Sequence, residues 1–116
     1  METTKKDFEA FKKECEKWYD KLRLEEWDLV YYHEDLKQSN AVAKINIVLV
    51  GKSAAIIFNK VINNSIAFKF EEAAKHEVIH LLLANISELG WSRFTTEDEI
   101  RTAEEALVRK LEKIIK

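Results

Sequence analysis

The spacing of hydrophobic positions predicts a helix at the start of the chain. Over residues 4–24 apolar side chains recur every three or four positions, which places them on one face of an amphipathic helix: Phe8, Phe11, Cys15, Trp18, Tyr19 and Leu22. Thr3 and Thr4 precede this pattern as capping candidates, and Asp7 stands three positions after Thr4. We therefore expect a capped helix that ends near Leu24.

The middle of the chain predicts β-strands. Residues 27–33, WDLVYYH, are rich in β-branched and aromatic side chains, and the run NAVAKINIVLV from Asn40 first alternates and then becomes apolar. A third β-like run, AAIIFN, follows Gly51, Lys52 and Ser53 at a spacing typical of a hairpin. The next segment, VINNSIAFKF, contains turn residues and is interpreted as a loop that leads into a helix.

Two helices complete the pattern. Residues 71–89 contain no proline or glycine, and Gly90 follows them where a helix often ends in a left-handed residue. A last helix is predicted over residues 97–115, because Thr96 and Glu99 have capping-box spacing. The order α-β-β-β-α-α predicts an α+β domain. Its sheet is expected to be small, three- to four-stranded and mostly antiparallel, and to pack on the three helices.

Composition narrows the class of protein. The 116 residues, of which 47% are hydrophobic and 34% charged, suit one soluble domain over residues 1–116. The net charge of -2 gives no overall attraction to nucleic acid or anionic membrane. The chain has neither a secretory signal nor an apolar run of the roughly 18 residues that a bilayer span needs. The single cysteine, Cys15, agrees with a reducing compartment, so we expect a cytoplasmic protein.

The second predicted helix carries the motif HEVIH, which contains two of the three histidines of the chain. A helix turns by about 100° per residue, so His76 and His80 lie about 40° apart and both imidazoles can reach one ion. Glu77 flanks the pair, where its carboxylate can contact a water molecule on the ion without being a ligand. Zinc lowers the pKa of such a water toward about 7 while the carboxylate accepts its proton. The motif therefore indicates a zinc-dependent hydrolase.

The neighbours of the motif favour a metal site over coincidence. AAK precedes it and LLL follows it, which indicates that much of this helix is buried. Two histidines and a glutamate in a buried helix each need a polar partner, and a divalent ion with its water supplies one for all three. The alternative is that three polar residues interrupt a core helix by chance.

A catalytic zinc takes three protein ligands as a rule, so a third must come from elsewhere. His33 is one candidate, but it ends a predicted strand beside acidic residues and is better explained as a surface histidine. In the last helix Glu104 falls at about 40° from Ile100, within the apolar stripe, whereas Glu105 falls on the charged flank. A carboxylate on an apolar face needs an ion pair or a metal. We predict Glu104 as the third ligand. There are two alternatives. Glu104 could form a salt bridge with a lysine or arginine instead of binding the metal, or Glu105 could be the ligand.

With these residues placed, the chain resembles the small zincin metallopeptidases of the gluzincin type, in particular phage-encoded metallopeptidases related to SprT-like and minimal gluzincin domains. HEVIHLLL, the later helix EEALVRKLEKII and the strand pair ending AAIIFN carry the resemblance, which spans most of the chain. It implies a zincin-like fold and a location in the host cytoplasm if the protein is phage-encoded.

The resemblance also implies roles for particular residues. His76, His80 and Glu104 would be ligands of Zn²⁺, and Glu77 would be the general base and acid. In such proteins an edge strand before the metal helix pairs with the peptide substrate, and this role would fall to Ala54 to Asn59.

The leading hypothesis is a zinc-dependent peptidase that hydrolyses peptide bonds. The second is a zinc-stabilised, catalytically weak adaptor or regulatory module with a zincin fold, because the chain is small and lacks the second subdomain of the larger thermolysin-like enzymes. A metal-free binding domain is the third. The oxyanion-stabilising residue stays open among Tyr31, Tyr32, His33 and Arg93, as do the substrate sequence and the oligomeric state.

Overall fold

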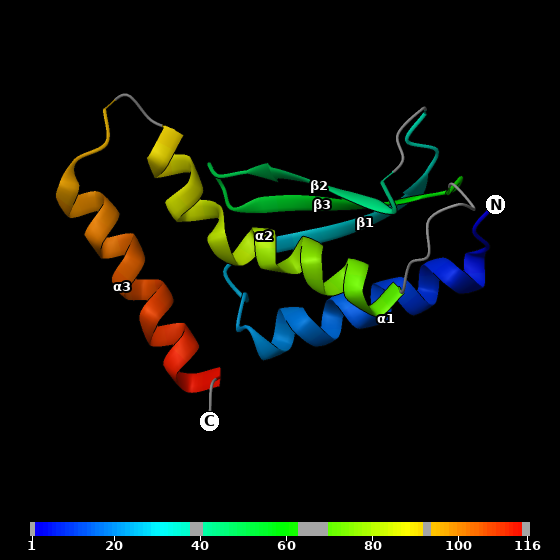
Figure 1. Ribbon diagram of the computed structural model, residues 1–116, viewed down its shortest axis with the longest axis horizontal. Helices are drawn as coiled ribbons and strands as arrows, with labels where there is room; N and C mark the ends of the chain where they lie inside the picture. Colours follow the sequence, from blue (N-terminus) through cyan, green and yellow to red (C-terminus); the bar gives the residue numbers. More distant parts are fainter. Residues whose placement is uncertain (1, 38–40, 63–69, 92–93, 115–116) are drawn as a thin grey trace.

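The computed structural model describes residues 2–37, 41–62, 70–91 and 94–114 (Figure 1). Its elements in chain order are α1 (Lys5–Lys21), β1 (Asp28–Glu34), β2 (Ala43–Val48), β3 (Ser53–Asn59), α2 (Phe70–Trp91) and α3 (Glu97–Ile114). The architecture is α+β, as the sequence predicts, with three helices and one small sheet. No helix in these four stretches combines the length and the apolar character that crossing a membrane requires.

The predicted cap of α1 is confirmed. The Thr4 hydroxyl accepts a hydrogen bond from the Asp7 N–H at 3.1 Å, and the Asp7 carboxylate accepts one from the Thr4 N–H at 2.9 Å. This capping box satisfies N–H groups that the first turn of a helix leaves without a partner. The helix ends at Lys21, and Arg23 takes a positive φ of 54° where the chain turns toward β1.

The sheet is mixed, with β3 between β1 and β2. β2 and β3 form the predicted antiparallel hairpin, whose turn is closed by a hydrogen bond from the Lys52 N–H to the Leu49 carbonyl at 3.1 Å. β1 runs parallel to β3, and Ile56 lies opposite both Tyr31 of β1 and Ile45 of β2. The expectation of a mostly antiparallel sheet is wrong, because β2 does not pair with β1 and β3 fills the place between them.

The position of β3 also corrects an expectation about the edge of the sheet. Ala54 to Asn59 were expected to form an edge strand, but they are bonded to a strand on each side. They have no free edge to which a peptide could add. The tight hairpin turn instead folds β2 to the outside of β3, where it forms the edge nearest to α2 (Figure 1).

The core lies between one face of the sheet and the helices α1 and α2 (Figure 1). Ile56 and Phe58 of β3 are fully buried, and the Phe58 ring stacks on Phe11 of α1 with centroids 4.6 Å apart. α2 adds Val78 and Leu81 to the same cluster. Since truncation of a buried phenylalanine costs about 3–5 kcal/mol, this aromatic contact strongly stabilises the packing of α1 on the sheet.

The two C-terminal helices differ in burial. α2 continues through Gly90 to Trp91, so the helix end predicted at Gly90 is wrong; a glycine near a helix end costs only about 1 kcal/mol. α3 begins with the predicted capping box, in which the Glu99 N–H donates to the Thr96 hydroxyl at 3.2 Å. Among the described residues of α3 none is fully buried. α3 is therefore held less tightly than α2.

Candidate metal centre

His76 and His80 lie one turn apart on the outward face of α2. Their Nε2 atoms are 3.2 Å apart, and their rings meet edge to face with centroids at 4.8 Å. Two imidazole nitrogens that bind one zinc ion at about 2.0–2.1 Å with tetrahedral angles lie about 3.3 Å apart. The pair therefore fits a shared zinc ion. A hydrogen bond between the two rings is the other interaction that this distance allows.

The burial of these residues differs from the expectation. Both histidines are exposed, so the premise that their desolvation requires an ion is wrong. The reason is the rotation of α2, which directs Val78 and Leu81 into the core and the two imidazoles toward solvent. Of the three polar residues of the motif only Glu77 is buried, with 9% of its surface exposed.

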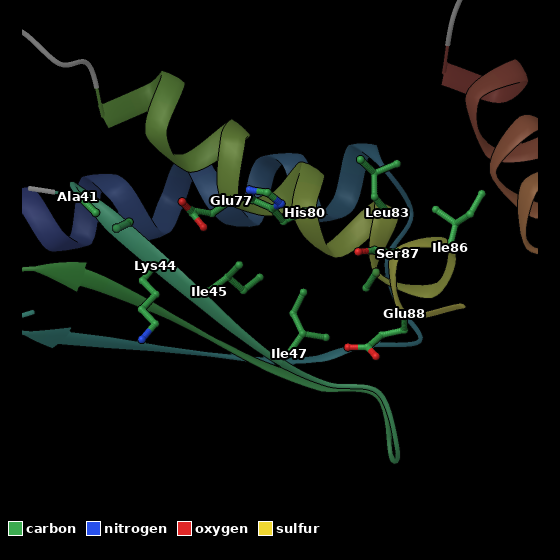
Figure 2. Close-up of a pocket in the computed structure, with 12 residues that line it drawn as sticks. Ala41, Lys44, Ile45, Ile47, Glu77, His80, Leu83, Ile86, Ser87 and Glu88 are labelled. Carbon is green, nitrogen blue, oxygen red and sulfur yellow. The ribbon is translucent and has the colours of Figure 1, made fainter. Parts of the chain in front are cut away.

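Glu77 points from α2 toward β2 (Figure 2). Burial raises the pKa of its carboxyl from the ordinary value of 4.5 to about 7. On the core side lies Cys15, whose thiol pKa is raised to about 12 by burial and, to a lesser degree, by the charge of Glu77. A carboxyl group with a pKa near neutrality can both accept and return a proton at physiological pH.

A groove of about 600 Å³ runs between α2 and β2 (Figure 2). Its walls are apolar, with Ile45 and Ile47 on β2 and, at the rim, Leu83 and Ile86 on α2, which extend away from β2 (Figure 2). Its lining is completed by Ala41, Ala43, Lys44, Glu77, His80, Ala84, Ser87 and Glu88. Glu77 and His80 lie near one end and Glu88 lies at the other (Figure 2). The candidate metal centre therefore opens onto an apolar channel that ends in a carboxylate.

Within the described residues, β2 presents unpaired main-chain groups beside this groove. The Asn59 N–H donates to the Val42 carbonyl at 2.9 Å, so Val42 and Asn59 form a hydrogen-bonded pair of the hairpin. Since bonded and non-bonded pairs alternate in an antiparallel ladder, Lys44 bonds to β3 whereas Ile45 and Ile47 direct their N–H and C=O groups away from it. An extended chain could therefore hydrogen-bond along β2.

The structure does not bring the predicted third ligand to the histidine pair. No group of three or more His, Cys, Asp or Glu that could hold a metal ion occurs in the described residues, which include all residues of these four types in the chain. Glu104 is exposed on α3. Glu105 is exposed as well and pairs with Arg109 at 3.6 Å. His76, Glu77 and His80 thus form an incomplete ligand set in this arrangement.

The rotation of α3 explains where Glu104 lies. Ala103, Ala106 and Leu107 line the space between α3 and α2, so these residues form the inner face of α3. The apolar stripe around Ile100 was expected to be that face. Its members Ala103 and Leu107 do lie there, but the centre of the stripe is turned away, because Ile100, Val108 and Leu111 are 37% to 40% exposed. The small alanines allow close approach, and Lys110 fixes the rotation through an ion pair with Glu26 at 3.0 Å.

The other candidates from the sequence lie away from the groove. His33, on β1 at the opposite edge of the sheet, contacts the Thr3 hydroxyl at 2.7 Å and stacks on Phe8 with centroids at 5.0 Å. It is half-buried, and burial lowers its pKa, so it is a structural histidine and not a surface one.

Neither tyrosine candidate lines the groove. Tyr31 and Tyr32 also lie on β1; burial raises the pKa of Tyr31, and Tyr32 is exposed. Arg93 lies outside the described residues. Within those residues no candidate for stabilising an oxyanion contacts the groove.

One groove residue escaped the sequence analysis although a signal was present. Glu88 stands eleven positions after Glu77, which is about three helical turns, so both carboxylates lie on the same side of α2. The alternation of Ile45 and Ile47 with polar residues likewise indicated one apolar side of β2. Neither pattern alone shows that these two surfaces face each other.

Comparison with protein-family models, with curated proteins and with solved structures finds no significant match to this chain. The candidate site therefore depends on the geometry of its own residues, and the resemblance to gluzincin-type zincins stays a prediction.

The raised pKa of Glu77 predicts a pH-dependent stability in the metal-free protein. The folded state holds the Glu77 proton more tightly than the unfolded state, because the pKa falls from about 7 to 4.5 on unfolding. The stability contributed by this group is therefore complete below pH 4.5 and is lost as the pH rises through about 7. Glu77→Gln stays neutral throughout and should lose this dependence.

The measurement is the thermal midpoint of both proteins with a chelator between about pH 5 and pH 8. We expect the midpoint of Glu77→Gln, relative to the parent, to rise with pH. Glu72→Gln, an exposed glutamate on the same helix, is the matched control and should keep a constant difference. A constant difference for Glu77→Gln as well would show that the Glu77 carboxyl titrates normally.

Proposed function

We propose that this protein is a zinc-dependent peptidase with a zincin-like fold, in which Glu77 is the general base. One arrangement of residues carries the proposal. The Nε2 atoms of His76 and His80 are 3.2 Å apart, and the adjacent Glu77 carboxyl is buried and has a pKa of about 7. Glu77 and His80 also line the groove that runs along β2. The same elements support a resemblance to gluzincin-type zincins, and the cytoplasmic location stays a prediction.

The division of chemical roles follows from these groups. A zinc ion held by His76 and His80 would supply a Lewis acid and a water of lowered pKa. Glu77 would accept the proton of the attacking water and return it to the departing amine, which requires a pKa near the working pH. Its buried position holds the carboxylate at the rim of the groove and limits its hydration.

A peptide is the substrate that suits the groove. The free N–H and C=O groups at Ile45 and Ile47 match those of an extended chain, which could add to β2 as a further strand. β2 thus takes the role that was expected of Ala54 to Asn59. A peptide in this position would pass beside Glu77 and His80, which line the same groove.

Completion of the metal site requires a third ligand, and Glu104 stays our proposal for it. Glu104 lies on α3 among the exposed apolar residues Ile100, Val108 and Leu111. The histidines on α2 have exposed apolar neighbours of their own, Ile79 and Leu83. If α3 docked its apolar stripe on this face of α2, both surfaces would be buried and Glu104 would approach the histidines.

Such a rearrangement would replace the present apolar contacts of Ala103 and Leu107 and the Lys110–Glu26 ion pair by new apolar contacts. Full burial of one large aliphatic side chain contributes about 1.5–3 kcal/mol and a partly exposed ion pair about 0–1 kcal/mol, so the gains and losses are of similar size. Zinc coordination would supply the additional stabilisation, since metal binding and folding are coupled.

The alternative is the zinc-stabilised adaptor or regulatory module with weak or no catalysis. The incomplete ligand set of the described residues is the observation in its favour, because a catalytic zinc takes three protein ligands as a rule and the structure brings only two histidines together. The two functions differ in turnover and not in the presence of the histidine pair.

The first prediction concerns zinc content and turnover. The parent protein should bind about one zinc ion per chain and cleave an unstructured protein such as casein. Glu77→Gln should keep the zinc and lose about 10²- to 10⁴-fold in turnover, the usual contribution of a general base. His76→Ala and His80→Ala should lose both zinc and turnover.

Metal analysis of protein purified without added zinc, combined with a cleavage assay, measures both quantities. Unchanged turnover in Glu77→Gln would remove Glu77 as the base. Zinc in the parent without turnover would favour the adaptor, and a chain without zinc affinity would exclude both functions.

The second prediction concerns the third ligand. Glu104→Gln should weaken zinc binding by at least about 10-fold, because the neutral amide is a poor ligand. Glu105→Gln makes the same chemical change on the adjacent exposed residue and should leave zinc affinity within about 2-fold. A competition titration with a zinc-binding dye measures both variants. Greater weakening in Glu105→Gln would assign Glu105 as the ligand, and unchanged affinity in both would place the third ligand elsewhere.

A further inference from the structure

The end of the groove farthest from Glu77 carries a carboxylate, that of Glu88, which peptide hydrolysis does not require. Glu88 lies at the opposite end from Glu77 and is exposed there (Figure 2). Within the described part of the chain it forms no ion pair. Lys44 also lines the groove, but its side chain points away from α2 (Figure 2). Glu88 is therefore available to a positively charged group that enters the groove.

The wall between the two carboxylates is apolar. Ile45 and Ile47 of β2 and Ala84 of α2 line the groove there, whereas Leu83 and Ile86 extend away from β2 at its rim (Figure 2). Such a wall accepts an aliphatic or aromatic side chain without leaving polar groups unpaired. The lining thus changes from apolar beside Ala84 to acidic at Glu88.

The spacing of these two subsites matches an extended peptide. Ala84 and Glu88 are four residues apart, so they lie on the same side of α2 with a rise of about 6 Å between them. Two residues of an antiparallel strand rise by about 6.8 Å. Side chains two positions apart point to the same side of a strand, so a peptide paired along β2 would present both of them to α2. The two subsites are therefore in register with alternate residues of one bound strand.

The direction of the peptide follows from the strand pairing. β2 runs from the end of the groove near Glu77 toward Ile47, which lies near Glu88 (Figure 2). Antiparallel pairs are slightly more stable per residue than parallel ones. A peptide added antiparallel to β2 would enter with its N-terminal part beside Glu88 and leave with its C-terminal part beside Glu77.

We propose that the groove selects peptides with a basic side chain facing Glu88 and, two residues later, an apolar side chain against Ala84 and Ile45, both N-terminal to the position beside Glu77. This selectivity rests on the proposed function, because it names the substrate of the same groove. Binding of the peptide depends on β2 and the two subsites, and cleavage depends in addition on Glu77 and the metal.

The test separates binding from cleavage. Zinc-loaded Glu77→Gln is titrated with three fluorescent peptides that differ at one position, Lys-Ala-Leu, Gln-Ala-Leu or Glu-Ala-Leu within a common flanking sequence, and fluorescence polarisation gives the Kd. We expect the lysine peptide to bind about 2- to 5-fold more tightly than the glutamine peptide, as for a partly exposed ion pair. The glutamate peptide should bind least tightly. Replacing leucine by serine should weaken binding by about 10-fold or more.

Charge reversal at Glu88 provides the decisive comparison. Adding Glu88→Lys to Glu77→Gln should reverse the order of the lysine and glutamate peptides. Adding Glu9→Lys, which makes the same charge change at an exposed site on α1, should preserve it. Circular dichroism checks that each variant is folded.

The outcomes of this experiment are distinct from those of the cleavage assay. Equal affinity for the three peptides, or an order that Glu88→Lys leaves unchanged, would overturn the selectivity even if the parent protein cleaves casein. A reversed order in a chain without peptidase activity would keep the selectivity and remove the catalytic function.

Discussion

The packing of α2 against the sheet and α1 determines the rest of the site. Ala74, Val78, Leu81 and Ala84 are spaced by three or four residues and are all buried, so they fix which side of α2 faces the core. With this rotation fixed, His76 and His80 must point outward. Glu77 then falls at the boundary between core and groove, where its carboxyl is desolvated and its pKa is raised to about 7. The exposure of the imidazoles and the burial of the carboxylate thus have the same cause.

Local patterns predicted the elements well because the determinants of each element lie within its own sequence. The capping box of Thr4 and Asp7 and that of Thr96 and Glu99 both form as expected. The order of the strands could not be predicted in this way, since a strand pattern does not specify its partner. A hint was present nonetheless: AAIIF is a continuous apolar run, as is typical of a central strand, whereas AKINIV alternates as an edge strand does.

The orientation of α3, and with it the position of Glu104, could not be predicted for a different physical reason. The apolar stripe of α3 is wide, and a rotation by part of a turn decides which of its residues face α2. Ala103 and Leu107 at one side of the stripe pack toward α2, while Ile100 and Leu111 at the other side stay partly exposed. The Lys110–Glu26 ion pair accompanies this rotation. Helical periodicity within α3 does not reveal such a long-range partner.

The central claim is that His76 and His80 bind one zinc ion together while a position is left for solvent. X-ray absorption spectroscopy of the zinc-loaded protein tests it most directly, because the spectrum reports the number and type of ligands on the ion. We expect two imidazole nitrogens and two oxygen ligands at about 2.0–2.2 Å. A spectrum with fewer than two imidazoles, or with four nitrogen or sulfur ligands and no oxygen, would contradict an open centre built on the histidine pair.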